Sequence, residues 1–93
     1  MSEHESSDHG TLRDEVRAGP GGAMTDEVGV ITGDVTVATT LLPDGRARVA
    51  IQYTRADEWY TLAGTPVTLP PDGLAALHAD AIDRVRRGGA AAY

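Results

Sequence analysis

The sequence VTVATTLLPDGRARVAIQY, residues 35–53, contains two β-patterned runs joined by a turn. Pro43 and Asp44 suit the centre of a type I turn, and Gly45 suits the left-handed position that follows. This turn chemistry predicts a β-hairpin with a three-residue loop and a glycine bulge. Alternation along the first run places on one face the side chains of Val35, Val37, Thr39 and Leu41.

The loop length also sets the register of this hairpin, and it places the apolar side chains of both runs on one face. A two-residue turn at Asp44 and Gly45 would shift the pairing by one residue and divide those side chains between the two faces. Turn chemistry and hydrophobic pattern therefore predict the same register. Its pairs are Leu41 with Ala47, Thr39 with Val49, Val37 with Ile51, and Val35 with Tyr53.

A third β-patterned run, WYTLAG at residues 59–64, follows a polar loop. Pairing Tyr53 with Tyr60 and Ile51 with Leu62 would extend the same apolar face. Trp59 would then lie on the opposite face. Upstream of the hairpin, Val28–Thr32 is also rich in β-branched residues, and the pattern leaves open whether it forms a separate strand.

A helix is expected after the third run, from Leu74 to the glycine pair at residues 88–89, which would end it. Its apolar stripe at helical spacing consists of Leu74, Leu77, His78, Ala81, Ile82 and Val85. One helix can cover one face of a three-stranded sheet but not both. The sequence therefore predicts an α+β fold: a three-stranded antiparallel meander, with room for an extra N-terminal strand, packed on one C-terminal helix.

The N-terminal residues have a different composition. Most of residues 1–26 are small, polar or acidic, so we expect a disordered acidic leader, followed by a folded domain at 27–89 and a flexible tail at 90–93. Within the leader, Thr11–Ala18 has Leu12 and Val16 four residues apart, which would suit a short helical segment that needs a partner to be stable. Gly19–Gly22 is expected to be a linker.

Charge and composition exclude several classes of function. The chain of 93 residues has a net charge of −6 and contains no cysteine, so thiol catalysis and thiolate metal sites are excluded. Acidity disfavours binding to nucleic acids and anionic membranes. His4 and His9 lie among acidic residues, but their spacing matches no rigid ligand pattern, so no metal or cofactor is predicted. Without a long apolar run or a signal-peptide pattern, we expect a soluble cytoplasmic protein. Because no catalytic or nucleotide signature is found in the sequence, we expect that it is not an enzyme.

The uncovered sheet face is the candidate binding site. Tryptophan is common at binding hot spots, so Trp59 is the expected anchor, with Arg46 and Arg48 as charges at its rim. Gln52 and Thr61 belong to the same face. A second candidate is His78 on the apolar stripe, expected near Tyr53 and Tyr60, where it could be a pH switch or a ligand group. We interpret it mainly as a hydrogen-bonded core or interface histidine, because no nucleophile is predicted beside it.

These features predict a small non-enzymatic protein-interaction module, such as a regulator, an adaptor or an immunity-type inhibitor, that docks through the uncovered face and forms a homodimer. Two alternatives stay open. A nucleic-acid-binding protein would use the face with Arg46, Arg48 and Trp59. A small-ligand-binding or enzymatic domain would be built around His78.

Overall fold

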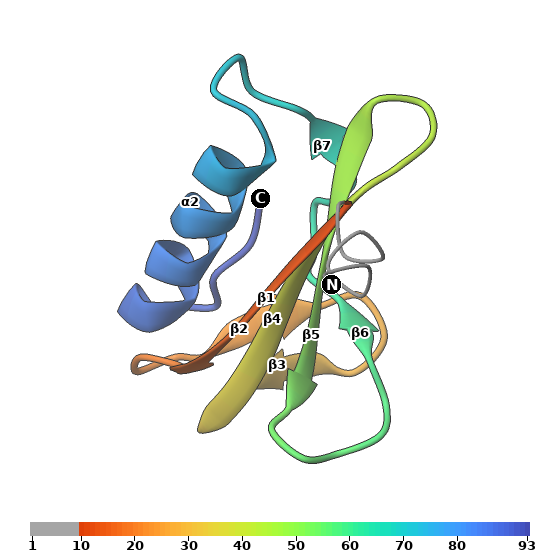
Figure 1. Ribbon diagram of the computed structural model, residues 1–93. Helices are drawn as coiled ribbons and strands as arrows, with labels where there is room; N and C mark the ends of the chain where they lie inside the picture. Colours follow the sequence, from red (N-terminus) through yellow and green to blue (C-terminus); the bar gives the residue numbers. More distant parts are fainter. Residues whose placement is uncertain (1–9) are drawn as a thin grey trace, which may run out of the picture.

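The computed structural model describes residues 10–93, and in that range seven strands and one helix are found (Figure 1). The strands are β1 (Thr11–Arg17), β2 (Ala23–Thr25), β3 (Gly29–Ile31), β4 (Asp34–Leu41), β5 (Arg46–Tyr53), β6 (Tyr60–Thr61) and β7 (Val67–Thr68), and the helix is α2 (Leu74–Arg87). The main sheet has the order β1-β4-β5-β6, and β7 pairs with the same strand β5. β2 and β3 form a separate two-stranded sheet. The predicted α+β class, an antiparallel sheet packed on one C-terminal helix, is confirmed.

The central hairpin has the predicted register. β4 pairs with β5 through Thr39 opposite Val49 and Val37 opposite Ile51. The loop closes as its chemistry requires, because Gly45 adopts a φ of 87° and the amide of Leu42 donates to the carbonyl of Arg46 at 2.8 Å. The valine and isoleucine side chains of both strands therefore lie on the same side of the sheet.

The third strand has the predicted face but not the predicted register. Tyr60 lies opposite Ile51 instead of Tyr53, a shift of two residues that keeps every side chain on its expected face. The shift arises because the chain continues past Tyr53 along β4: the amide of Thr54 donates to the carbonyl of Asp34 at 3.0 Å. The return to β6 therefore starts later than the sequence suggested.

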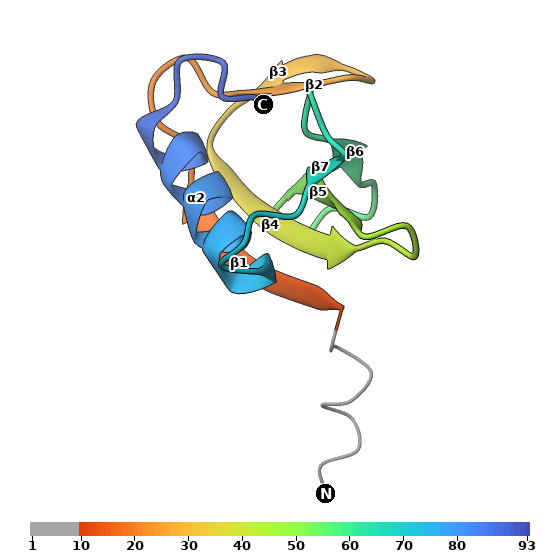
Figure 2. The same cartoon turned by 90° about the horizontal axis from the view of Figure 1, so that it is seen from above.

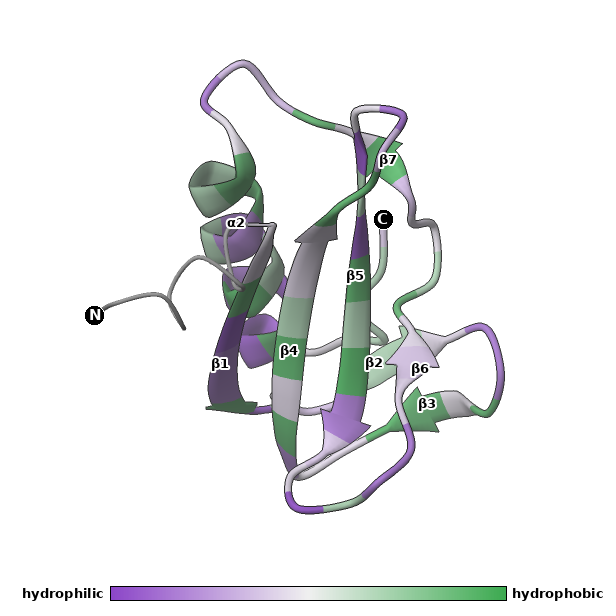
Figure 3. Cartoon of the chain, turned by 45° about the vertical axis from the view of Figure 1, so that its right-hand side comes forward, coloured by the Kyte–Doolittle hydropathy of each residue, from purple (hydrophilic) through white to green (hydrophobic). Residues whose placement is uncertain are grey.

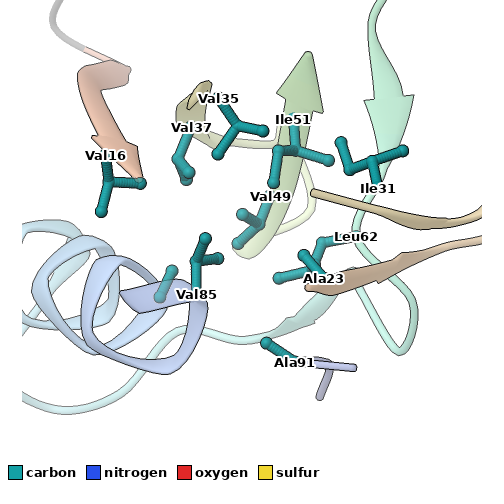
Figure 4. Packing of buried hydrophobic residues seen from close by; sticks show 11 residues of the cluster. Val16, Ala23, Ile31, Val35, Val37, Val49, Ile51, Leu62, Val85 and Ala91 are labelled. Carbon is teal, nitrogen blue, oxygen red and sulfur yellow. The ribbon is translucent and has the colours of Figure 1, made fainter. Parts of the chain in front are cut away.

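One buried cluster joins the inner face of the main sheet to α2, to the β2–β3 pair and to the C-terminal segment (Figure 4). Its members are Val16, Ala23, Ile31, Val35, Val37, Val49, Ile51, Leu62, Ala81, Val85 and Ala91. The helix packs on β1 and β4, whereas β2 and β3 lie beside the C-terminus (Figure 2). The inner face is thus covered by two different elements, and the helix alone does not cover it.

The predicted leader at 1–26 is corrected by the strands that it contains. Residues 11–17 form β1, which pairs with β4 and places Val16 opposite Val35 in the core. The helical expectation for Thr11–Ala18 was wrong, because Leu12, Asp14 and Val16 alternate on one face as a strand requires. Residues 1–9, with His4 and His9, lie outside the described residues.

The expected linker at Gly19–Gly22 is a packed turn against the end of α2. The amide of Gly19 donates to the carbonyl of Val85 at 3.0 Å, and the amide of Gly89 donates to the carbonyl of Pro20 at 2.6 Å. A β-carbon at Gly19 would collide with the backbone of Arg86 and Arg87, so only glycine fits there. β2 and β3 follow directly, and the candidate segment Val28–Thr32 contains β3.

The C-terminal residues, expected to be a flexible tail, are instead an extended segment bonded on both sides. The amide of Met24 donates to the carbonyl of Ala91 at 2.9 Å, and the amide of Tyr93 donates to the carbonyl of Ala63 at 2.8 Å. The Tyr93 hydroxyl donates to Asp80 on α2 at 2.6 Å. Burial and this carboxylate both raise the pKa of Tyr93. The tail therefore fastens the β2–β3 pair and the helix to the main sheet.

Candidate functional site

The side of the main sheet away from α2, here called the outer face, carries the even-numbered residues of β4 and β5 and the odd-numbered residues of β1. Its side chains are those of Thr11, Arg13, Glu15, Arg17, Asp34, Thr36, Ala38, Thr40, Arg46, Arg48, Ala50, Gln52 and Thr61. Most of them are small or polar. Figure 3 shows the strands of this sheet side by side, with β1 at one edge.

Trp59 extends across the outer face from the β6 side toward β1. The Arg13 guanidinium lies 5.3 Å from the centre of its ring, which is within the range of a cation–π contact. Arg13 comes from the opposite edge of the sheet, so the two side chains must bridge β4 and β5, where Ala38 and Ala50 leave room for them. Trp59 is nevertheless 38% exposed. The result is a flat aromatic surface held in place by an arginine.

Two arginines of the outer face form exposed ion pairs within the chain. The Nε atom of Arg46 lies 2.9 Å from Asp44, and Arg17 lies 3.0 Å from Asp34. The two hydrogen bonds that Asp44 accepts from the amide and the side chain of Arg46 lower the pKa of that carboxyl group. Arg13 faces Trp59, a contact that leaves its charge in place, and within residues 10–93 neither Arg13 nor Arg48 forms an ion pair.

Two other residues of the predicted site are engaged inside the chain. The amide nitrogen of Gln52 donates to the carbonyl of Ala56 at 2.9 Å. The amide and hydroxyl of Thr61 both donate to the carboxylate of Glu27, at 2.7 and 2.8 Å. The bond from the Thr61 amide is the main reason why the pKa of Glu27 is lowered. Glu27 thereby closes the outer edge of β6.

His78, on α2, is buried against β1 and β4 and forms hydrogen bonds through both ring nitrogens. Nδ1 lies 2.7 Å from the hydroxyl of Thr39, and Nε2 lies 2.8 Å from a carboxylate oxygen of Asp14. Thr39 is fully buried, so its hydroxyl cannot reach a substrate. The sequence placed His78 near Tyr53 and Tyr60, but its hydrogen-bond partners are these two other residues. These two hydrogen bonds link β1, β4 and α2.

A groove of about 530 Å³ runs between β1 and α2. It is lined by Asp14 and His78 together with other residues of β1 and of the helix. The apolar lining residues are Leu12, Ala75, Ala79 and Ile82. Its charged lining residues include Arg13 and Glu15, which also belong to the outer face. The groove is a second candidate binding surface, at the β1 edge.

Within residues 10–93, no group of three histidine, cysteine or acidic side chains is arranged to hold a metal ion. In the same range, no helix has the length and apolar character needed to cross a membrane. No residue set in this part of the chain indicates a particular cofactor.

Three residues that were not predicted from the sequence contact predicted site residues: Arg13, Asp14 and Glu27. The first two were missed because their segment was assigned to the leader. Alternation along residues 11–17 is compatible with a strand, but Leu12 and Val16 share one face of a helix as well, so the spacing did not decide between them. Glu27 carried no local signal, because its partner Thr61 lies 34 residues further along the chain.

No protein-family model, curated protein or solved structure matches this chain.

Proposed function

We propose that this protein is a non-enzymatic protein-interaction module that docks a partner on its outer face, with Trp59 as the anchor. The observation that carries the proposal is the pair formed by Trp59 and Arg13. An aromatic ring that is 38% exposed on a flat surface of small side chains has the form of a binding hot spot. Arg13 reduces the rotamer freedom of the ring before binding, which lowers the entropy cost of docking.

The charges of the outer face favour a protein over a nucleic acid as partner. Arg46 and Arg17 are each paired with a carboxylate, and the whole chain is acidic. Arg48 and Arg13 then act as rim charges that select the orientation of a partner. A homodimer and a cytoplasmic location belong to the same proposal, the latter because the chain lacks cysteine.

The test uses the single tryptophan of the chain. Proteins captured from the native cell by the wild type are compared with those captured by Trp59→Ala and by Tyr53→Ala, since Tyr53 is a similarly exposed aromatic residue at 41%. We expect Trp59→Ala to lose the partner and Tyr53→Ala to keep it. Binding of the recovered partner to the wild type should also change the emission of Trp59. Equal recovery by all three proteins would show that the anchor is wrong.

A further inference from the structure

β1 is a strand edge that the described part of the chain leaves unpaired. The carbonyl of Gly10 accepts from Leu41, and the amide of Ala18 donates to Gly33, so the even-numbered residues of β1 direct their backbone groups toward β4. The backbone N–H and C=O groups of Thr11, Arg13, Glu15 and Arg17 then point away from the sheet. Such a row of donors and acceptors is a template for another strand.

At the opposite edge of the main sheet, the backbone groups of β6 are already hydrogen-bonded within the chain. At β6, Glu27 accepts the amide and hydroxyl hydrogens of Thr61, and the amide of Asp26 donates to the Thr61 carbonyl at 3.0 Å. A short strand with its backbone groups already bonded cannot recruit another chain. Strand addition is therefore directed to β1.

The groove between β1 and α2 leaves space for a strand beside β1. It has a volume of about 530 Å³ and is lined by Arg13, Asp14 and Glu15 of the β1 edge. On its helical side, Ala75 and Ala79 are exposed, one turn apart. An added strand would bond to the edge and place its inward side chains against this apolar wall.

The charge pattern of β1 selects its own copy as the occupant. In an antiparallel pairing centred on Asp14, Arg13 of each chain lies opposite Glu15 of the other, and Leu12 lies opposite Val16. Both ion pairs are then cross-strand neighbours on the outer face, and both apolar pairs lie on the inner side. Centring on Arg13 or on Glu15 would place that residue opposite its own copy and would lose both ion pairs, at a cost.

We propose that two copies of this chain pair their β1 strands antiparallel about a two-fold axis at Asp14, forming one continuous sheet across the dimer. This inference rests on the proposed function only in treating the protein as an interaction module. The proposed dimer leaves Trp59 accessible. With strands about 4.8 Å apart, two helices that each lie over a β1–β4 pair run side by side at about 10 Å, a normal helix-packing distance. Ala75 and Ala79 permit that approach.

The two Asp14 residues face each other across the axis, and the structure shows how their charges are accommodated. Each carboxylate lies 2.8 Å from Nε2 of its own His78, and the Asp14 side chain is 66% exposed to solvent. The charge is therefore partnered and hydrated before the second copy arrives. The like-charge cost at the axis is offset by the two flanking ion pairs.

Sedimentation of the purified full chain tests the interface. We expect a dimer for the wild type, a monomer for Glu15→Arg, and recovery of the dimer when Arg13→Glu is added to Glu15→Arg. Asp57→Arg makes the same charge change on an exposed loop and should remain a dimer. A wild type that is monomeric at about 100 μM, a concentration at which even weak dimers form, would overturn the proposal, as would a monomeric double variant that is folded.

Two further variants cover the case in which charge reversal affects folding. Glu15→Pro removes an outward N–H without breaking a bond to β4, so it should give a folded monomer. Asp14→Cys should form an intermolecular disulfide on mild oxidation, because residues opposite each other in a non-hydrogen-bonded pair are about 4.5 Å apart at Cα. Asp57→Cys should not, and the chain has no native cysteine to compete.

Readouts on the outer face keep the two proposals distinguishable. Trp59→Ala should lose the captured partner but remain a dimer, whereas Glu15→Pro should be monomeric and keep the outer face. A dimer abolished by Trp59→Ala and unaffected by Glu15→Pro would assign self-association to the outer face and refute the β1 interface.

Discussion

The hydrogen bond between Thr39 and His78 should be a measurable part of the stability of this domain. Thr39 is fully buried and His78 is 6% exposed, and their Oγ1 and Nδ1 atoms are 2.7 Å apart. Replacing Thr39 with Val keeps the shape of the side chain and leaves Nδ1 without a partner and out of reach of water. A buried polar group left in this way costs about 1–3 kcal/mol. We therefore expect Thr39→Val to lower the free energy of unfolding by that amount.

The assay is urea denaturation followed by circular dichroism. For a chain of this size the dependence on urea is about 1–1.5 kcal/mol per molar, so the midpoint should fall by about 0.7–3 M. Adding His78→Leu to Thr39→Val removes the orphaned nitrogen, and the double variant should be more stable than the sum of the two single losses predicts, by about 1 kcal/mol or more.

Asp14→Asn is the matched control, because it changes the other hydrogen-bond partner of His78. The Asp14 side chain is 66% exposed, so water replaces most of what the substitution removes, and we expect a loss below about 1 kcal/mol. The reasoning is refuted if Thr39→Val unfolds within about 0.5 kcal/mol of the wild type, or if Asp14→Asn is the more damaging of the two.

Three other predictions concern the segments that hold the sheet together. Gly64→Ala should cost more than about 2 kcal/mol in urea unfolding, because φ is +90° there and a β-carbon would meet the backbone of Tyr93; Gly33→Ala, with a φ of +86° and open space around it, should show only the conformational cost of about 1–2 kcal/mol. Ile51→Ala should cost about 2–5 kcal/mol, since the side chain is fully buried, and an unchanged melting temperature would contradict the core assignment. The pKa of Glu27 is lowered in the folded state, so the contribution of this carboxylate to stability is complete above its unfolded pKa and is lost as the pH falls through the folded pKa. Glu27→Gln should therefore unfold more easily than the wild type at neutral pH. The difference should shrink in acid titrations between about pH 5 and pH 3. A difference that grows in acid would contradict the assigned role.

The sequence was sufficient where the determining interactions are local. The turn at Pro43–Gly45 fixes the hairpin register within a few residues, and the helix pattern from Leu74 needs no distant partner. The face of Trp59 followed from alternation alone. The register of β6 did not, because Thr54 continues along β4, and its bond to Asp34 joins residues that are 20 positions apart in the sequence.

β1 could not be separated from a helix by spacing, since Leu12 and Val16 lie on one face in either conformation. The deciding residue was Asp14, which is polar and yet points to the covered side of the sheet. Its partner His78 lies 64 residues further along the chain, so no local rule would have accounted for it. The candidate site was therefore predicted on its β5 and β6 side and missed on its β1 side, where Arg13 completes it.

Asp14 also makes the proposed edge of β1 selective. An unpartnered inward charge would make an edge strand unable to pair, which is one way in which proteins prevent aggregation. Here His78 already holds that charge, so the edge stays available, while Arg13 and Glu15 on its other side resist any strand that does not supply the opposite charges in the matching order. An apolar strand would leave both charges without partners at the junction. Only a strand with the alternation of β1 itself satisfies them, and the same residues that keep the edge from pairing at random therefore specify a second copy.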